Sequence, residues 1–423
     1  MTNEIELGYG RGSVRFAFDE ERCQILAPNG PGEPPLSDRQ IGEEFDSPID
    51  SPPLEEIVAA GNSVLIVISD ATRATACGQI VNLLVRRLIQ IGIVPRDIAI
   101  IFATGIHRPV TAKEKVELLT PFIAQRIKTI DHDAYNQRGL VHLGTTARGT
   151  PIELNRALKD YSRVITTGAI GFHYFAGFSG GRKSICPGLA SARTIEATHM
   201  LALDFERGGR RLGVGTGLLD GNAVHEECER IAELINPSFS INTVIDERGR
   251  VTAIYAGHWR TMHRQASGEY LSSHSLKIES KRDLVIVSCG GLPWDINLIQ
   301  AHKALDMATY ACVEGGTIIL LAECGDGFGR PDFLKWFECE NSSVLEERLR
   351  KDYEVNGQTA WSLLTKTEAY RIYLISKLAE EDVRRMRMTP ARSLADAVAD
   401  IDEYKQGYIL PRGAALLPVA ELP

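Results

Sequence analysis

The chain has 423 residues, more than one hydrophobic core normally holds, so its length predicts two domains that each bury their own apolar surface. Its 55 acidic and 47 basic residues give a formal net charge of −8, and it contains no long basic run, which argues against a nucleic-acid partner. The N-terminus is polar and acidic, and no stretch reaches the roughly 18 consecutive apolar residues of a membrane span, so we expect a cytoplasmic protein with no membrane partner.

The eight cysteines are scattered along the chain without a Cys-x-x-Cys pair. This spacing favours reduced thiols that fill small core positions over a disulfide framework or a zinc knuckle.

Short runs of apolar, β-branched residues recur along the chain, and each is followed by a loop and then by a helix-like pattern. The clearest runs are residues 64–69, 97–104, 163–168, 283–290 and 316–323. Their nearly continuous hydrophobicity indicates burial on both faces, so we predict an α/β fold of two domains, with mostly parallel sheets flanked by helices.

The segments between these strands are less uniform. Residues 74–91 and 296–313 carry apolar side chains at helical spacing. Residues 14–26 differ, because they form two short apolar runs around an acidic turn, and we predict a hairpin there that lies outside the parallel sheet.

A polar stretch at residues 272–282 marks the expected domain boundary. We therefore predict an N-terminal catalytic and cofactor-anchoring domain over residues 1–275 and a C-terminal α/β domain over residues 276–408. The apolar tail at residues 409–423 either extends the second domain or packs back onto the first.

Polar residues that follow the predicted strands are the candidate site residues, because open α/β sheets bind ligands beyond the carboxyl ends of their strands. Four strand ends carry histidines, cations and carboxylates. These residues are Asp70, Thr72, Arg73, His107, Arg108, His173, Ser179, Arg182, Lys183, Trp294, Asp295, Asn297, Gln300 and Lys303, and His199 follows on a predicted helix.

Each of these residues also has a plain structural interpretation. Asp70 can serve as the N-cap of the following helix, a role compatible with an anion held by that helix end and Arg73. The GFSGGRKS turn resembles a phosphate-binding loop but lacks the GxxxxGK[ST] spacing, so a bare glycine-rich turn stays open. Gln300 and Lys303 share one helix face, which is either solvated or turned toward a cleft.

The histidines can also be interpreted as a metal site. His107, His173 and His199 form a conceivable zinc triad, but there is no HExxH motif and no pair at i, i+4 spacing. A single histidine combined with soft donors from outside the protein also holds a metal. From residue spacing alone, the chain is a two-domain α/β protein with a cationic, histidine-bearing cleft.

The motifs DATRAT, ATGIHRP and GFHYFAGFSGGRKSICPG, followed by His199, resemble those of the nickel-dependent lactate racemase family of 2-hydroxyacid racemases and epimerases. The resemblance runs in order from about Asp70 to Lys303, and its long central string is highly specific. It implies an active site in the cleft between two domains and an isomerase that acts on hydroxy acids.

The resemblance also implies a cofactor and its anchors. The cofactor is a nickel-pincer nucleotide (nickel pyridinium-3,5-bisthiocarboxylate mononucleotide), which dedicated biosynthesis enzymes supply. By position, Lys183 is its covalent attachment point and His199 is the protein ligand of nickel. The acid/base histidines fall on His107 and His173.

The remaining family positions contact the cofactor or the substrate. The loop after the first strand matches the cofactor-contacting segment, whose residues here are Asp70, Ala71, Thr72 and Arg73. Arg73, Gln300 and Lys303 match substrate contacts. In the implied mechanism one histidine removes the hydroxyl proton while the α-hydrogen leaves as hydride, and the planar 2-keto acid regains hydride on its other face.

One departure concerns the substrate. In lactate-specific members a tyrosine precedes the Gln-x-x-Lys pair, whereas Ile299 stands here. We therefore expect a wider pocket that accepts 2-hydroxy acids larger than lactate. Three alternatives stay open. The first is racemisation of malate or another hydroxy acid by the same chemistry, in which Arg108 or Arg330 supplies a second cation. The others are a cofactor-binding relative without catalysis and a zinc hydrolase that uses the three histidines.

Overall fold

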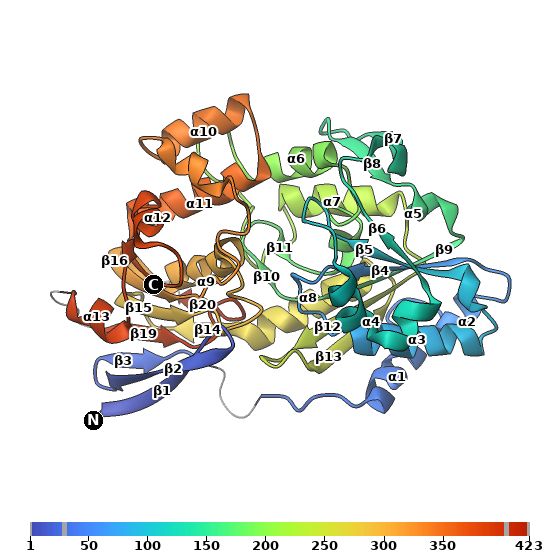
Figure 1. The fold of residues 1–423 in the computed structure, drawn as a ribbon, viewed down its shortest axis with the longest axis horizontal. Helices are drawn as coiled ribbons and strands as arrows, with labels where there is room; N and C mark the ends of the chain where they lie inside the picture. Colours follow the sequence, from blue (N-terminus) through green and yellow to red (C-terminus); the bar gives the residue numbers. More distant parts are fainter. Residues whose placement is uncertain (1, 28–31, 402–405, 421–423) are drawn as a thin grey trace. The chain divides into compact units, whose positions relative to one another are not determined.

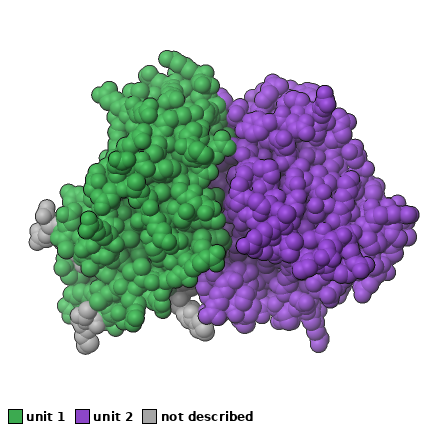
Figure 2. All heavy atoms as spheres, viewed as in Figure 1, with its two compact units in different colours: residues 1–31, 204–209, 272–423 green, residues 32–203, 210–271 purple. Residues whose placement is uncertain are grey.

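The structure, a computed structural model, describes residues 2–27, 32–401 and 406–420. The described chain divides into two compact units, which Figure 2 colours separately. Unit 1 contains residues 2–27, 204–209, 272–401 and 406–420, and unit 2 contains residues 32–203 and 210–271. Each unit is built on its own sheet, as the sequence predicts for two α/β domains.

Unit 2 contains a six-stranded sheet in the order β13-β12-β9-β4-β5-β6, in which every neighbouring pair is parallel except β12 with β13 (Figure 1). Its strands are β4 (Val64–Ser69), β5 (Ile98–Ala103), β6 (Lys128–Asp131), β9 (Arg163–Ala169), β12 (Phe239–Ile245) and β13 (Val251–Gly257). Four short strands lie outside this sheet and form two antiparallel pairs. They are β7 (Leu140–Thr145) with β8 (Pro151–Asn155), and β10 (Phe172–His173) with β11 (Gly177–Phe178).

The helical elements of unit 2 fill the connections between these strands. They are α1 (Asp38–Asp46), α2 (Leu54–Ile57), α3 (Cys77–Gln90), α4 (Ala112–Arg126), α5 (Ala157–Asp160), α6 (Ala192–Met200), α7 (Ala223–Glu233) and α8 (Thr261–His274), with the 3-10 turns η1 (Pro95–Asp97), η2 (Gln137–Gly139) and η3 (Gly181–Ser184). Helix α8 crosses the boundary after residue 271 and ends in unit 1.

The core of unit 2 explains why the central strands are continuously apolar. The first five residues of both β4 and β5 are buried, because helices cover the sheet on either side. Helix α3 presents Ile80, Leu84 and Leu88 to this core, at the spacing that the sequence predicts for a buried face, and it packs beside α4 (Figure 1).

Unit 1 contains a second six-stranded sheet, which is parallel throughout, in the order β18-β17-β16-β15-β19-β3. Its strands are β3 (Cys23–Ile25), β15 (Arg282–Ser288), β16 (Cys312–Leu321), β17 (Arg371–Ile375), β18 (Thr389–Pro390) and β19 (Gly407–Leu410). The helical elements are α9 (Leu298–Ala311), η4 (Phe333–Glu338), α10 (Ser342–Lys351), α11 (Val355–Ala369), α12 (Glu380–Arg385) and α13 (Leu394–Ala399).

The N-terminal segment differs from the prediction. The hairpin is formed by β1 (Thr2–Tyr9) and β2 (Gly12–Asp19), and it reverses at Gly10, whose φ of +55° suits glycine. The second half of the segment predicted to be a hairpin, β3, instead joins the edge of the parallel sheet beside β19. The predicted domain over residues 1–275 is therefore corrected, because residues 2–27 belong to unit 1, where β1 and β2 form a separate two-stranded sheet and β3 forms the edge of the six-stranded sheet.

The C-terminal tail also belongs to unit 1. Strand β19 lies between β15 and β3, and β20 (Leu417–Ala420) pairs in parallel with β14 (Ser275–Ile278). The described part of the tail, residues 409–420, therefore extends the C-terminal domain, unit 1, which is the first of the two predicted alternatives. Throughout the described ranges, none of the helices combines the length and the apolarity that crossing a membrane requires.

Candidate functional site

The candidate site in unit 2 begins at the ends of three neighbouring parallel strands, β9, β4 and β5. Parallel strands end at one edge of their sheet, so the loops that follow them lie close together. Asp70 follows β4, His107 follows β5 and His173 follows β9. The sheet therefore brings together residues that are far apart in the sequence.

Asp70 and His107 are in direct contact. The Nδ1 atom of His107 lies 2.7 Å from Oδ2 of Asp70, whose side chain is only 3% exposed. The other carboxylate oxygen, Oδ1, accepts hydrogen bonds from the backbone N–H of Thr72 at 2.8 Å and from its hydroxyl at 2.6 Å. Ala71 lies in the same turn, and the N–H of Arg73 donates to the Asp70 carbonyl.

These contacts keep Asp70 ionised. Burial alone raises the pKa of a carboxyl group, but here the hydrogen bond and charge of His107, the charge of Arg73 and the hydrogen bond from Thr72 outweigh it and lower the pKa of Asp70 to about 2. A carboxylate cannot donate, so Nδ1 of His107 carries the proton of this contact, and in the neutral form of the ring Nε2 presents a lone pair. The predicted N-cap role is not observed, because helix α3 begins later, after Ala76.

His173 lies on the short strand β10 and is buried. Its Nδ1 accepts a hydrogen bond from the backbone N–H of Ala176 at 3.3 Å. Its ring stacks on Tyr174, with centroids 5.4 Å apart and planes 12° apart, and it meets the edge of Phe175 at 4.6 Å. The aromatic residues around the predicted histidine therefore fix its orientation.

Phe175 contacts several of the predicted site residues, and the sequence did not indicate these contacts. Its ring contacts that of His199 at a centroid distance of 5.0 Å, in addition to that of His173. The Nζ atom of Lys183 lies 5.8 Å from the same ring centroid. Three of the predicted functional residues thus surround one phenyl ring.

Lys183 lies in the turn η3, after two glycines that both adopt positive φ. Among the described residues, its Nζ makes no hydrogen bond and no ion pair, and burial together with the charges of Arg182 and Arg73 holds the pKa of Lys183 well below its usual value. An amine whose pKa is lowered in this way releases its proton more readily than an ordinary lysine, and the neutral amine is a nucleophile.

His199 lies in the last turn of α6, which begins at the N-cap Ser191. Its Nδ1 donates to the carbonyl of Ile195, one helical turn earlier, at 2.8 Å. Burial, together with the charges of Lys183 and His107, lowers the pKa of His199 to about 3. The ring is therefore neutral, and its Nε2 bears a lone pair that suits a metal ion.

Arg182, which the sequence places among the loop cations, is almost fully buried at 2% exposure. Its guanidinium donates to the carbonyl of Ala176 at 2.7 Å and lies 3.0 Å from Nε2 of His263. Burial lowers the pKa of Arg182 to about 10. A cation in a glycine-rich turn is usually exposed, so no sequence signal indicated this burial.

Two of the predicted substrate contacts, Gln300 and Lys303, belong to unit 1. Gln300 and Lys303 lie in the first turns of α9, which follows β15 and is capped by the side chain of Asn297. The Nζ atom of Lys303 donates to Oε1 of Gln300 at 2.8 Å, so the two side chains share one face. Ile299 precedes them and is partly buried.

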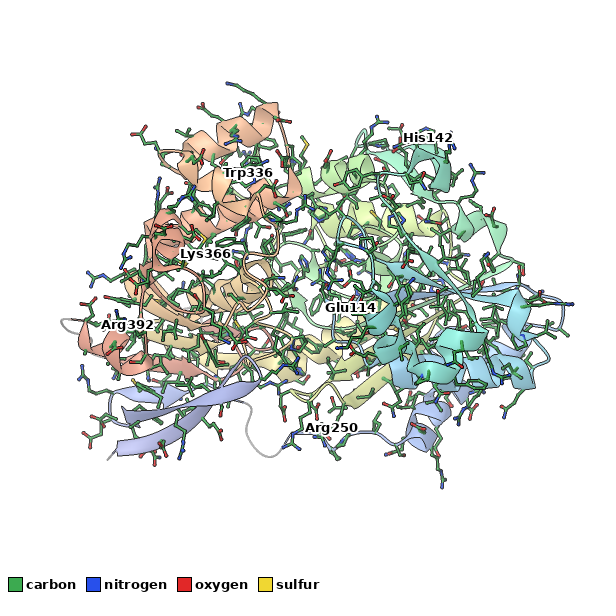
Figure 3. The ribbon with its side chains drawn as sticks, viewed as in Figure 1. Glu114, His142, Arg250, Trp336, Lys366 and Arg392 are labelled. Carbon is green, nitrogen blue, oxygen red and sulfur yellow. The ribbon has the colours of Figure 1, made fainter. Side chains whose placement is uncertain are left out.

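Two arginines considered as additional cations have acidic neighbours. Arg108 makes a two-point contact with the carboxylate of Glu114, a residue labelled in Figure 3 that also closes the N-terminus of α4. Arg330 lies 3.7 Å from Asp332. Neither arrangement singles out a second substrate carboxylate.

The histidines and cysteines do not form a protein-only metal site in the part of the chain that is described. No group of three or more His, Cys, Asp or Glu side chains is arranged there to hold a metal ion. All eight cysteines are free thiols, and seven of them are buried. The conceivable zinc triad is therefore not assembled in these residues.

Comparisons with known proteins match this architecture. The model of the lactate racemase N-terminal domain matches residues 9–209, and that of the C-terminal domain matches residues 278–410. The lactate racemase of Thermoanaerobacterium thermosaccharolyticum is 28% identical over 426 residues, which cover 98% of each chain. The lactate racemase of Lactiplantibacillus plantarum is 31% identical over 78% of this chain and 77% of its own.

Solved structures agree with the sequence comparison. The lactate racemase apoprotein from T. thermosaccharolyticum superimposes with a TM-score of 0.88 at 27% identity, covering 98% of this chain and all of the other. A protein from Thermotoga maritima has a TM-score of 0.72 at 21% identity over 91% of this chain and 99% of its own, and it shares the fold. This chain belongs to the lactate racemase family and is an isomerase of the racemase type.

Proposed function

We propose that the chain inverts the α-carbon of 2-hydroxy acids, with His107 and His173 as acid/base groups and a nickel-pincer nucleotide held by Lys183 and His199. The observation that carries this proposal is the grouping around Phe175, whose ring contacts His173, His199 and the amine of Lys183. Two imidazoles and an amine that has no ion-pair partner among the described residues form an unusual set around one ring of a purely structural core, and acid/base and attachment chemistry accounts for all of them.

The residues present fit the proposed cofactor. The Lys183 amine has no hydrogen-bond or ion-pair partner among the described residues, and its pKa is held well below the usual lysine value, which suits covalent attachment. His199 donates through Nδ1 to the Ile195 carbonyl, which leaves Nε2 as a nickel ligand. The cofactor brings its own sulfur donors, and sulfur with imidazole suits nickel. When bound, this group supplies a reversible hydride acceptor.

His107 is oriented to accept the proton of the substrate hydroxyl. Its Nδ1–H is held by the Asp70 carboxylate at 2.7 Å, so Nε2 can take the hydroxyl proton of a substrate. Once His107 holds that proton, the substrate oxygen becomes the carbonyl oxygen of the 2-keto acid as the α-hydrogen departs as hydride.

His173 serves the opposite enantiomer. Inversion brings the substrate oxygen to the other side of the reacting carbon, so a second acid/base group is required there. Imidazole suits this task because it gains and loses a proton near neutral pH.

Cations fix the substrate carboxylate, so that only the reacting carbon changes its orientation. We assign this task to Arg73 in unit 2 and to the Gln300–Lys303 pair in unit 1. The Lys303 ammonium is already oriented by Oε1 of Gln300 at 2.8 Å. Asp70, Ala71 and Thr72 complete the cofactor-contacting loop.

The range of accepted substrates includes 2-hydroxy acids with side chains larger than that of lactate. Ile299 precedes the Gln300–Lys303 pair, and an isoleucine gives an apolar wall where the lactate-specific members have a tyrosine. A dicarboxylic acid is the second candidate, but Arg108 is already engaged by Glu114, which leaves it less suited to a second carboxylate.

Isotopic labelling tests the reaction directly. The chain is produced together with the cofactor-making enzymes, and lactate bearing deuterium at C2 is racemised in ordinary water. The proposal predicts that both enantiomers keep deuterium at C2, because the hydrogen returns as hydride. Loss of deuterium to the solvent during racemisation would mean that the α-hydrogen leaves as a proton, and the proposed mechanism would then be wrong.

A further inference from the structure

The two histidines of the site have opposite neighbours at Nδ1. The Nδ1 of His107 faces the carboxylate of Asp70 at 2.7 Å. The Nδ1 of His173 faces the backbone N–H of Ala176 at 3.3 Å. A carboxylate accepts and a backbone N–H donates, so the two contacts impose opposite proton positions on the two rings.

The proton positions follow from these partners. On His107 the proton sits on Nδ1, and Nε2 carries the lone pair. On neutral His173 the lone pair sits on Nδ1, and Nε2 carries the proton. His107 is therefore set to take a proton, whereas His173 is set to donate a hydrogen bond.

Ala176, whose N–H contacts His173, is also held by Arg182, which binds its carbonyl in the next peptide group along the chain. The guanidinium donates from Nη2 to the carbonyl of Ala176 at 2.7 Å, and that carbonyl also accepts the N–H of Phe178 at 2.9 Å. The carbonyl and the N–H of Ala176 thus link Arg182 to His173. A charge-assisted hydrogen bond of this length is among the stronger protein contacts.

Arg182 has no other evident task that would justify its burial. It is 2% exposed, and within the described residues it forms no ion pair with a carboxylate. Its remaining partners are Nε2 of His263 at 3.0 Å and a long contact to the carbonyl of Gly180, and its own Nε is unsatisfied. Burying an unpaired guanidinium is costly, so a function is expected for it.

The aromatic neighbours of His173 keep the ring from turning over. Tyr174 stacks on one face at 5.4 Å, and Phe175 meets the ring edge-on at 4.6 Å. Rotating the ring by half a turn would put Cδ2 in the place of Nδ1 and break the contact with the Ala176 N–H, but it requires these close-packed rings to move. The Ala176 contact is therefore not easily bypassed.

We propose that Arg182 is a positioning residue, which holds the backbone of Ala176 through its carbonyl so that the N–H of the same residue fixes His173 with the proton on Nε2, and that the two histidines are unequal before substrate binds. The catalytic meaning of this inequality rests on the proposed function. His107 can accept a proton as it stands, whereas His173 must first release the Ala176 N–H.

Nitrogen NMR on the full-length protein without cofactor tests the proton positions. Histidine labelled with ¹⁵N reports which ring nitrogen carries hydrogen, and His107→Gln and His173→Gln variants assign the two signal sets. We expect protonated Nδ1 on His107 and protonated Nε2 on His173. The same tautomer on both rings, or protonated Nδ1 on neutral His173, would overturn the proposal.

Substitution of Arg182 tests the positioning role. In Arg182→Met the Nδ1 signal of His173 should move away from its hydrogen-bonded position while that of His107 stays, and Arg182→Lys should restore part of the change. The matched control is Arg163→Met, because Arg163 also donates to a backbone carbonyl but lies at the opposite end of β9. An unchanged His173 spectrum in Arg182→Met, or in Arg182→Lys if the methionine variant fails to fold, would contradict the role.

These measurements need neither cofactor nor substrate, so they separate the inference from the proposed function. Opposite tautomers without racemase activity would leave the inference standing and remove its catalytic meaning. Equal tautomers in an active racemase would remove the inference alone.

Discussion

Asp70 and His107 are 37 positions apart in the sequence, yet Oδ2 of the first lies 2.7 Å from Nδ1 of the second. The contact exists because β4 and β5 are adjacent parallel strands whose carboxyl ends meet at one edge of the sheet. Asp70 is also held through Oδ1 by Thr72, so the carboxylate has one orientation. The pair combines a fixed acceptor with an imidazole, as in catalytic dyads of other enzymes.

Asp70→Asn tests whether this carboxylate serves catalysis. The amide can no longer hold Nδ1–H through a charged acceptor, and its NH2 group can impose the opposite tautomer on His107. We expect the kcat for lactate racemisation to fall by about 10²- to 10⁴-fold, with a smaller change in KM. The measurement compares preparations matched for bound nickel.

The matched control is Asp246→Asn, which removes a carboxylate paired with Arg250 in the turn between β12 and β13. Its kcat should stay within about threefold of the unmodified chain. An Asp70→Asn enzyme that stays equally close would show that the dyad has no catalytic role.

Buried histidines predict that the fold weakens in mild acid. His225 is fully buried, neither ring nitrogen has a hydrogen-bond partner, and burial followed by the charge of Arg182 lowers the pKa of His225 to about 2. The unfolded chain binds this proton below about pH 6.5 whereas the folded chain does not. Stability is therefore lost as the pH falls from about 6.5, at up to about 1.4 kcal/mol per pH unit for this one group.

His225→Leu should remove that loss. We expect the free energy of unfolding at pH 7 to stay within about 1 kcal/mol of the unmodified chain, and the variant to gain about 2 kcal/mol relative to it at pH 5. Urea unfolding at the two pH values gives both numbers. His142→Leu, at an exposed position labelled in Figure 3, is the control and should show no such gain. Equal pH dependence in both variants would refute the prediction.

Asp70 affects stability in a separate and lower pH window. The pKa of Asp70 is lowered to about 2, so its contribution is complete above the unfolded value near 4 and is lost as the pH falls from about 4 to about 2. The acid sensitivity of the Asp70→Asn variant should therefore resemble that of the unmodified chain between pH 7 and pH 5. A large difference between them in that range would contradict the assigned pKa.

Ile299→Tyr tests the proposed substrate range. Tyrosine fills apolar space beside Gln300 and Lys303, so acids with large side chains should lose more than lactate does. We expect the ratio of kcat/KM for 2-hydroxybutyrate or phenyllactate to that for lactate to fall by about 10-fold or more. Ile299→Leu keeps the apolar volume and should leave the ratio near its original value. Strict preference of the unmodified chain for lactate would contradict the proposed substrate range.

The strands, and the polar residues that follow them, could be predicted from the sequence because buried parallel strands are continuously apolar. The run at residues 64–69 coincides with β4, and the polar residues after β4, β5 and β9 are those of the candidate site. The helix predicted to end near His199 is α6, which the structure shows beginning after the N-cap Ser191.

Other features depend on contacts that no local pattern records. The Asp70–His107 contact requires the order of strands, which a single strand does not encode. Arg182 was misleading, because arginine in a glycine-rich turn suggests an exposed cation, whereas this guanidinium is buried and holds a backbone carbonyl. Strand β3 was assigned to a hairpin because its long-range partner, β19, lies at the other end of the chain.

The attachment of a cofactor at Lys183 is the central claim, and intact-mass measurement tests it most directly. The chain is produced with and without the cofactor-making enzymes, digested and mapped, and its nickel content is determined, with Lys183→Arg as the matched variant. The account predicts a nucleotide adduct on the Lys183 peptide, bound nickel and racemase activity in the co-produced chain, and none of the three in Lys183→Arg. Racemase activity with an unmodified Lys183 peptide, or an adduct on another residue, would contradict it.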